Sequence, residues 1–407
     1  MHIIAERLQS IKQGWTTQKW VLYVLSVYSR IWLMAACLTR QGRLDSLDIL
    51  RGLDMVFLTV AARWLRAAAE VWGFSDPVRY PIMRQVSHYW GEFTAYDVIM
   101  PLFIFMCGAA IPFALGRRLA DGRAGWPYWR HVLGRVALLW VLGMMTQGDL
   151  LTLDPMKISP YNNTLQTIAA GYLIAAVVYA VGKRWLTWVA PIALAGVYGA
   201  ILAYGGDYTQ DGNVAQVVEQ RILTALVPAG SAAFTTWGYT WFLTTFMFGA
   251  MTLAGLNATE ILRRTDWTPR RRAVTLFGVA AVLAALGFAA EACGEPSIKQ
   301  ISTFSFTAEG MGLCVALLAV LYVLVDVWGC HRGWGLVRLF GQNALACYLI
   351  AVTFKKVLVC ASETFFGGFA RIVGAAGLPL VLAIGQSVIL VAALWIWQNY
   401  KKARRGR

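Results

Sequence analysis

The segment YDVIMPLFIFMCGAAIPFAL, residues 96–115, decides the fold class of this chain. Its one charged residue is Asp97, near the start, and the next charge along the chain is Arg117. A helix crosses the hydrocarbon core of a bilayer when about 20 consecutive residues are mainly apolar. Residues 96–115 therefore predict a transmembrane helix, with Asp97 placed where that helix begins.

Segments of the same kind recur along the rest of the sequence. Those that we expect to span a bilayer are residues 47–69, 130–147, 163–182, 185–204, 234–256, 273–292, 306–326, 338–358 and 376–397. The sequence thus predicts an all-α fold, a polytopic membrane helical bundle of about 10–11 transmembrane helices. We divide the chain into an N-terminal extension with a possible extra or interfacial helix (1–42), a single transmembrane domain (43–400) and a basic cytoplasmic tail (401–407).

The composition agrees with a chain that is solvated by lipid. Of its 407 residues, 58% are hydrophobic and 14% are charged, whereas about a quarter of a soluble domain is charged. Many of the 18 Trp and 16 Tyr lie at the edges of apolar segments, where amphipathic rings settle at the membrane boundary. The seven Cys show no metal-ligand spacing, so the sequence predicts no metal site.

The formal net charge is +15, but the Lys and Arg residues form short clusters between apolar segments instead of lining one face. We therefore predict no nucleic-acid partner. Every second connection is basic, namely residues 117–130, 183–184, 263–272, 332–338 and the tail. Basic connections stay in the cytoplasm, so we expect a multi-pass protein of the inner (plasma) membrane whose C-terminus is cytoplasmic. The connections expected outside are residues 70–95, 148–162, 205–233, 293–305 and 359–375.

Charged groups near lipid are costly unless they are paired or functional. The first such cluster is DSLDILRGLD, residues 45–54. Asp48 and Arg51 are three residues apart and share one helix face. They are candidates for substrate or cofactor binding. The alternative is a structural ion pair, with Gly52 allowing another helix to approach closely.

The second cluster, SHYWGEFTAYD, covers residues 87–97. Of the four histidines, only His88 lies in a connection expected outside with carboxylates nearby. An imidazole titrates near neutrality, and a carboxylate such as Asp97 can orient it and raise its basicity. His88 is therefore our candidate general base. The alternative is that it is only a polar anchor at the membrane interface.

Other polar residues occur where predicted spans begin. Asn163 and Gln166 are one helical turn apart and are candidates for lining a polar cavity; the alternative is that Asn162 or Asn163 caps a helix. Lys299 and Asn343 are further binding candidates. A lysine at this position can also simply extend to the interface, and an asparagine can bridge two helices.

These motifs together resemble the heparan-α-glucosaminide N-acetyltransferase family and its bacterial relatives. The resemblance rests on SLDILRGLDM (46–55), HYWGEFTAYDVIMPLFIFMCGAAIPFALGRR (88–118), NTLQTIAAGYL (163–173), EPSIKQISTFSF (295–306), LYVLVDVWG (321–329) and GQNALACYL (341–349), which occur in the family's order. It implies a membrane-embedded acyltransferase of the bacterial inner membrane. His88 matches the catalytic histidine, and Asp97, Gln166, Lys299 and Asn343 match recurrent polar positions.

The implied reaction transfers an acetyl group from cytoplasmic acetyl-coenzyme A to a saccharide on the other side of the membrane. Acetyl-coenzyme A would be a co-substrate and no metal is needed; a homodimer is one assembly compatible with the sequence. The chain departs from the family at residues 60–63, VAAR, where many members carry an Asn, and at Thr167, which replaces an Arg. The acceptor, an amino sugar or a sugar hydroxyl, therefore stays open.

Two other classes of function fit the same sequence. In a transporter or a flippase for a lipid-linked glycan, intramembrane polar groups bind and pass a solute without chemistry. A catalytically inactive relative that only binds coenzyme A is the third reading, which the absent Asn encourages. Within the enzyme reading, direct transfer with His88 as base competes with a covalent acetyl-histidine intermediate.

Overall fold

The computed structural model describes residues 44–120, 123–146, 154, 156–234 and 238–405. The predicted N-terminal extension and the last two residues of the basic tail lie outside this range. Apart from a hairpin of two short antiparallel strands, β1 (Leu119–Ala120) and β2 (Arg123–Ala124), the regular structure of the described residues is helical. The predicted all-α class is confirmed.

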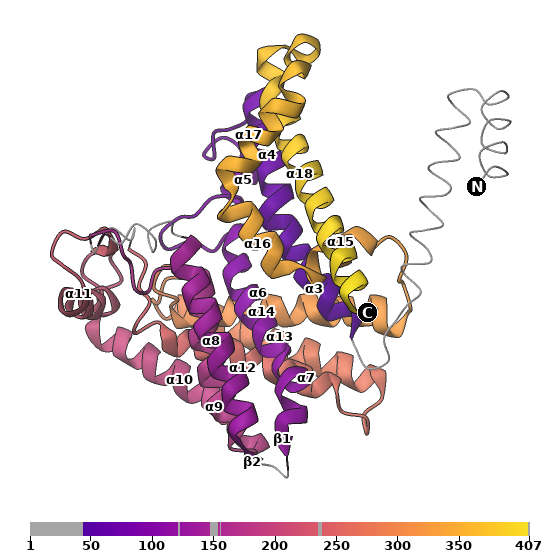
Figure 1. Ribbon diagram of the computed structural model, residues 1–407. Coiled ribbons are helices and arrows are strands. Elements are labelled where there is room, and N and C mark those ends of the chain that lie inside the picture. Colours follow the sequence, from indigo (N-terminus) through magenta and orange to yellow (C-terminus); the bar gives the residue numbers. More distant parts are fainter. Residues whose placement is uncertain (1–43, 121–122, 147–153, 155, 235–237, 406–407) are drawn as a thin grey trace, which may run out of the picture.

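The helices follow the chain in this order: α3 (Asp45–Val56), η1 (Phe57–Ala61), α4 (Ala62–Trp72), α5 (Pro81–Arg84), η2 (Ala95–Val98), α6 (Ile99–Ala109), α7 (Ile111–Leu115), η3 (Gly116–Arg118), α8 (Trp126–Thr146), α9 (Thr164–Ala180), α10 (Arg184–Gly205), α11 (Val214–Leu226), η5 (Ala232–Phe234), α12 (Thr245–Leu262), α13 (Pro269–Ala292), α14 (Phe304–Leu321), η6 (Tyr322–Val327), α15 (Gly335–Gln342), α16 (Ala344–Val352), α17 (Lys355–Phe366), η7 (Gly367–Phe369) and α18 (Ala370–Arg405). Figure 1 shows α3 and α4 running in line beside α18.

The prediction of about ten spans is confirmed only in part. Within the described residues, five helical segments are long and apolar enough to cross a membrane: Ala95–Leu115, Arg184–Gly205, Pro269–Ala292, Phe304–Val327 and Lys355–Ala403. The pair α15 and α16, bent by 80°, makes a sixth if it is counted as one span. These helices support a membrane protein, whereas the full count of spans stays a prediction.

The predicted span 234–256 is wrong at its start, because residues 238–244 are not helical and α12 begins at Thr245. The predicted segments 47–69, 130–147 and 163–182 miss the criterion although they are mainly helical, and their sequences explain why. Helix α9 is 17 residues long, one turn shorter than a typical span. Helix α8 contains Arg135, and α4 contains Arg63 and Arg66. Charges lower the hydropathy of a helix, and inside a membrane they are retained where they have a partner or a function.

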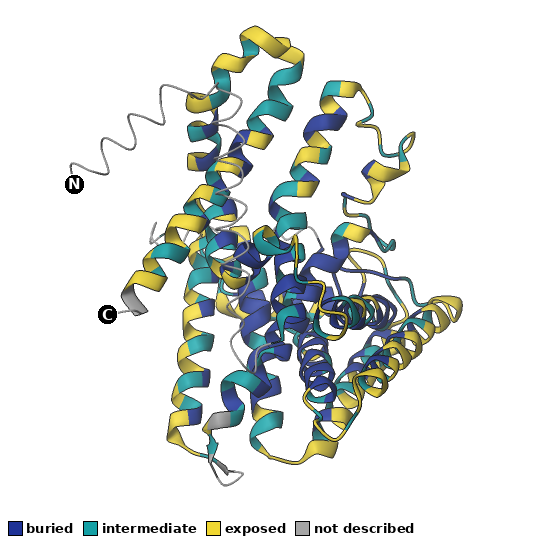
Figure 2. Ribbon diagram, turned by 90° about the vertical axis from the view of Figure 1, so that its right-hand side faces the viewer, coloured by how far each residue is buried: buried dark blue, intermediate teal, exposed yellow. Residues whose placement is uncertain are grey.

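Small residues bring the central helices into backbone contact. A Cβ on Gly108 of α6 would lie 1.8 Å from the carbonyl oxygen of Thr252 on α12, and one on Gly255 would lie 1.9 Å from that of Phe105. Such close approach is typical of helix pairs in membranes. Helices α6 and α12 thus form the centre of the bundle, where buried residues gather in Figure 2, and the exposed positions lie on the outer helices.

The contact predicted for Gly52 is present. A Cβ at this position would lie 2.0 Å from the carbonyl oxygen of Val337, and one on Gly341 would lie 1.9 Å from that of Asp48. Helices α3 and α15 therefore cross with their backbones touching. The predicted pairing of Asp48 with Arg51 is also present, with Oδ1 and Nη1 3.8 Å apart.

The connections expected outside contact one another. The Trp90 indole donates a hydrogen bond to the carbonyl oxygen of Tyr208 at 3.0 Å, and the Ala232 N–H donates to that of Met156 at 2.8 Å. Three connections that are far apart in the sequence, residues 70–95, 148–162 and 205–233, are thereby joined at one end of the bundle.

Two arginines of the basic connections bond to other helices. The Arg263 guanidinium donates to the carbonyl oxygen of Pro112 at 3.4 Å, which joins the end of α12 to α7. The Arg338 guanidinium donates to the Asp45 carboxylate at 2.9 Å, which joins the start of α15 to the start of α3.

Candidate active site

His88 lies between α5 and η2 and pairs with Asp97. The imidazole Nδ1 is 2.5 Å from Asp97 Oδ1, and the side chains are 36% and 1% exposed, respectively. The tautomer protonated on Nδ1 fits this contact, because Nδ1 faces a carboxylate. This leaves Nε2 as an acceptor, which is the state that a general base needs.

Asp97 is fixed by the start of its own helix. Thr94 is the N-cap of η2, and Asp97 is the third residue after it; its Oδ2 accepts the Thr94 backbone N–H at 3.1 Å. The Thr94 hydroxyl lies 2.7 Å from the same oxygen. This capping box holds Oδ2, so that Oδ1 is directed at His88.

Lys299 brings a positive charge to the same carboxylate. Its Nζ is 3.1 Å from Asp97 Oδ1, and it is 3.2 Å from Nδ1 and 3.5 Å from Nε2 of His88. The side chain is 6% exposed. Burial lowers the pKa of Lys299 from its ordinary value, and the charge of Asp97 opposes this shift. We refer to His88, Asp97 and Lys299 as the triad.

The connection that carries Lys299 is rigidly held. The Glu295 carboxylate accepts the backbone N–H groups of Phe304 and Ser305, at 3.0 and 3.3 Å, and so caps the start of α14. Within it, Ser302 has a φ of 43°, the only positive φ outside glycine among the described residues. Strained backbone of this kind is common at functional sites, and here it forms the turn after Lys299.

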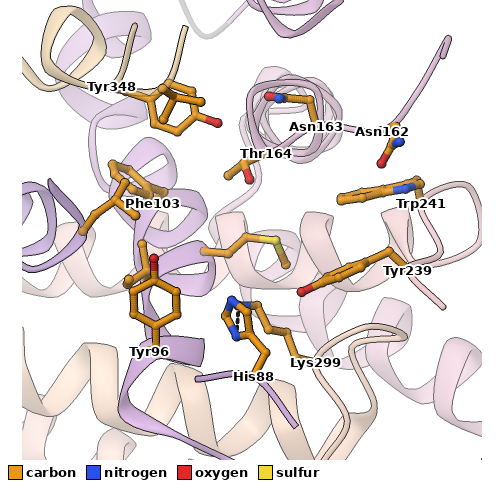
Figure 3. A pocket seen from close by; sticks show the side chains of 14 residues that line it. His88, Tyr96, Phe103, Asn162, Asn163, Thr164, Tyr239, Trp241, Lys299 and Tyr348 are labelled. Atoms are coloured by element: carbon orange, nitrogen blue, oxygen red, sulfur yellow. Dashed lines mark hydrogen bonds between the residues drawn. The ribbon is translucent and has the colours of Figure 1, made fainter. Parts of the chain in front are cut away.

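His88 and Lys299 line a cavity of about 390 Å³, which we call the His88 cavity. Figure 3 shows two groups that face each other across it: His88, Lys299 and Tyr239 on one side, and Asn163, Thr164 and Tyr348 on the other. Its remaining lining residues are Leu58, Tyr96, Ile99, Met100, Phe103, Asn162, Trp241 and Val352. The cavity combines apolar walls with a few polar groups, as ligand sites usually do.

Tyr239 and Trp241 give this cavity an aromatic wall. Their rings stack with centroids 5.6 Å apart and an interplanar angle of 12°. Behind them, Oε2 of buried Glu219 accepts the backbone N–H groups of Trp241 and Phe242, each at 3.0 Å. Burial raises the pKa of Glu219 to about 7, although both hydrogen bonds lower it. Glu219 thus positions the aromatic wall from outside the cavity.

Asn163 both caps a helix and lines the cavity. Its Oδ1 accepts the Leu165 N–H at 2.8 Å at the start of α9, as the capping alternative predicts, and its Nδ2 donates to the Thr146 hydroxyl at 2.8 Å. Structure and binding are therefore compatible roles for this residue.

A second cavity, of about 410 Å³, contains Arg51, and we call it the Arg51 cavity. Arg135 of α8 is its other cation; its guanidinium lies over the ring of buried Tyr172, 4.6 Å from the centroid. The start of α16 also lines it, through Ala344 and Leu345. Cations and a helix N-terminus together favour an anionic ligand.

The other candidates from the sequence lie outside both cavities. Gln166 is fully buried, and its amide accepts from the Asn162 N–H at 2.9 Å and donates to the carbonyl oxygen of Pro160 at 2.8 Å. Asn343 lies at the bend between α15 and α16 and donates to the carbonyl oxygen of Leu339 at 2.9 Å. Asp48 is buried and pairs with Arg51. Gln166, Asn343 and Asp48 therefore each support a segment that lines a cavity.

Sequence reasoning missed several lining residues. Arg135 had a usable signal, because an arginine inside a predicted span needs a partner or a function. Tyr239 and Trp241 had none, since aromatic residues near the edges of apolar segments are ordinary at membrane interfaces. Tyr348 had none either, because it lies in the middle of the predicted span 338–358. Comparisons with known proteins add no family, because no family model and no curated protein matches this chain.

Proposed function

We propose that this protein is a membrane-embedded acyltransferase that transfers an acetyl group from cytoplasmic acetyl-coenzyme A to a saccharide on the outer side of the membrane. The observation that carries the proposal is the triad, in which a buried Asp97 orients the imidazole of His88 at the edge of a cavity. The resemblance of its motifs to the glucosaminide N-acetyltransferase family supports the same reaction.

In the proposed reaction, a hydroxyl or amine of the acceptor lies in the His88 cavity. His88 Nε2 removes its proton while the oxygen or nitrogen bonds to the carbonyl carbon of the thioester. Asp97 stabilises the imidazolium that forms, and Lys299, which lines the cavity, places a positive charge near the oxyanion. The C–S bond then breaks, the acetylated acceptor forms, and the thiolate takes the proton from His88.

The donor would enter through the Arg51 cavity. Coenzyme A carries phosphates, which guanidinium groups and a helix N-terminus bind well. Arg51 and Arg135 supply the cations, and the first residues of α16 complete the lining. The thioester end would then point toward the His88 cavity, which shares part of its wall with the Arg51 cavity.

The rival function is transport, and one observation favours it. Helices α15 and α16 are bent by 80° at Asn343, and broken helices line the substrate sites of many transporters. The two adjoining cavities would then form a solute path, and the triad would bind solute without chemistry.

The deciding experiment measures thiol release from acetyl-coenzyme A by purified protein with a panel of amino sugars and neutral sugars. We expect release that depends on an acceptor, and a drop of about 10²- to 10⁴-fold in His88→Ala, because that is the usual contribution of a general base. His131→Ala is the matched control, since His131 lines neither cavity.

Three results would contradict the proposed enzymatic function. Thiol release that is absent, or equal in His88→Ala and wild type, contradicts the proposed chemistry. Saturable binding of coenzyme A without turnover indicates an inactive binding protein. Entry of labelled sugar into proteoliposomes without acetylation indicates a transporter. A burst of coenzyme A release without acceptor would instead favour the acetyl-histidine route.

A further inference from the structure

The two cavities share one stretch of wall. Three residues line both of them, Phe103, Thr164 and Tyr348, and we call these residues the shared wall. The rings of Phe103 and Tyr348 pack edge to face, with centroids 6.4 Å apart and planes at 78°. The two cavities therefore adjoin at this pair of rings.

Residues from two helices form one side of the shared wall. Figure 3 shows Asn163 and Thr164 beside Tyr348 on the same side of the His88 cavity. Asn163 is fixed to the Leu165 N–H and the Thr146 hydroxyl. This side of the shared wall is therefore built from the start of α9 and from α16.

The backbone holds the other side. Phe103 belongs to α6, which is in direct backbone contact with α12 two residues further on, where Gly255 meets the carbonyl oxygen of Phe105. The backbone at Phe103 is therefore held by the centre of the bundle, and its ring packs against that of Tyr348.

The surface beside the shared wall is apolar. On the His88 side it is continued by Ile99, Met100 and Val352, and on the Arg51 side by Met106 and Leu345. Such a surface suits a hydrocarbon chain better than sugar hydroxyls. Under the proposed function, the acyl end of the donor is the part of the thioester that meets this surface.

We infer that the shared wall selects the length of the acyl chain, with Phe103 and Tyr348 as specificity-determining residues for a short acyl thioester. The inference rests on the proposed function. A tightly bounded apolar site discriminates by about 10- to 200-fold for each methylene group. Acetyl-coenzyme A should therefore be used best, and each added methylene should lower kcat/KM.

The test uses the full chain in nanodiscs with acetyl-, propionyl-, butyryl- and hexanoyl-coenzyme A. Phe103→Ala should raise the ratio of kcat/KM for hexanoyl to that for acetyl donor by about tenfold or more, since it removes one ring of the pair. Tyr348→Phe keeps the ring and should leave the chain-length preference unchanged. Phe246→Ala is the matched control, because Phe246 is an exposed residue of α12 outside both cavities.

An active Phe103→Ala with the wild-type order of preference would overturn the inference. If Phe103→Ala does not elute as a single species, Phe103→Leu replaces it, and a smaller change in the same direction is expected. A wild type that releases thiol from none of the four donors would overturn the proposed function, and the inference with it. The two failures are thus distinguishable.

Discussion

Lys299 is the residue whose charge distinguishes this site from a simple His and Asp pair. Its ammonium lies near both ring nitrogens of His88 and near the oxygen of Asp97 that orients the ring. Lys299 is thus buried against the His88 and Asp97 pair and does not extend to the membrane interface.

This arrangement predicts how turnover depends on pH. Because burial lowers the pKa of Lys299, its ammonium loses its proton at a lower pH than an exposed lysine does. Turnover should fall as the pH rises through that value. Lys299→Met should lower turnover by about 10- to 100-fold, the equivalent of one charge-assisted hydrogen bond, and should abolish this alkaline decline. Rates of thiol release from about pH 7 to about pH 10.5 measure both; an unchanged decline in Lys299→Met would contradict the assignment.

The contrast between His88 and Gln166 shows how far the sequence predicts the site. His88 and Asp97 stood out because ionisable groups are rare near predicted spans, and the structure brings them together. Gln166 showed the same polar signal, yet its amide is used by Asn162 and Pro160. Polarity at a helix start marks a buried hydrogen-bonding group, but only packing decides whether that group faces a cavity or a loop.

At the scale of elements, the crossing of α3 and α15 connects the fold to the donor side of the proposed reaction. Helix α3 carries Arg51, and the segment around Gly341 lines the same cavity. The backbones meet at Gly52 and at Gly341. A shift of either helix would therefore change the shape of the Arg51 cavity.

Gly52→Ala should destabilise the protein. Its methyl group would lie 2.0 Å from a backbone carbonyl oxygen, so the helices must separate, at a cost of about 1–3 kcal/mol for overpacking. Gly278→Ala on α13 is the control, because a Cβ at that position would meet no atom within 4 Å and alanine favours helix. Thermal unfolding in detergent should show a lower Tm for Gly52→Ala alone; equal Tm values would contradict this crossing.

Helices were predictable from the sequence where a long apolar segment forms them. Residues 96–115 form one of the long apolar segments, as predicted, because no charge interrupts them after Asp97. The segment predicted at 338–358 is instead bent by 80° at Asn343. Hydropathy cannot reveal such a bend, since it measures the apolar content of a segment and not the direction of its helices.

At the scale of the whole molecule, the order of cavities along the bundle is the central feature of the proposal. His88 and Lys299 lie in connections expected outside, and Asp97 lies at the start of the span that follows His88. Arg135 instead follows the basic connection 117–130, and Arg51 lies near the start of the first predicted span, 47–69. A donor from the cytoplasm and an acceptor from the other side would thus meet at the shared wall. The direction of transfer depends on which end of the bundle faces the cytoplasm.

Two native cysteines test this orientation. Cys293 follows α13 in a connection expected outside, Cys330 follows η6 in a basic connection, and both are exposed. In variants that keep only one of them, with the other cysteines changed to serine, a membrane-impermeant maleimide added to intact spheroplasts should label Cys293. Cys330 should react only after the membrane is permeabilised, because the basic connections stay in the cytoplasm. The opposite pattern would place the triad inside and Arg51 outside, and a cytoplasmic donor could then no longer reach its acceptor in the proposed direction.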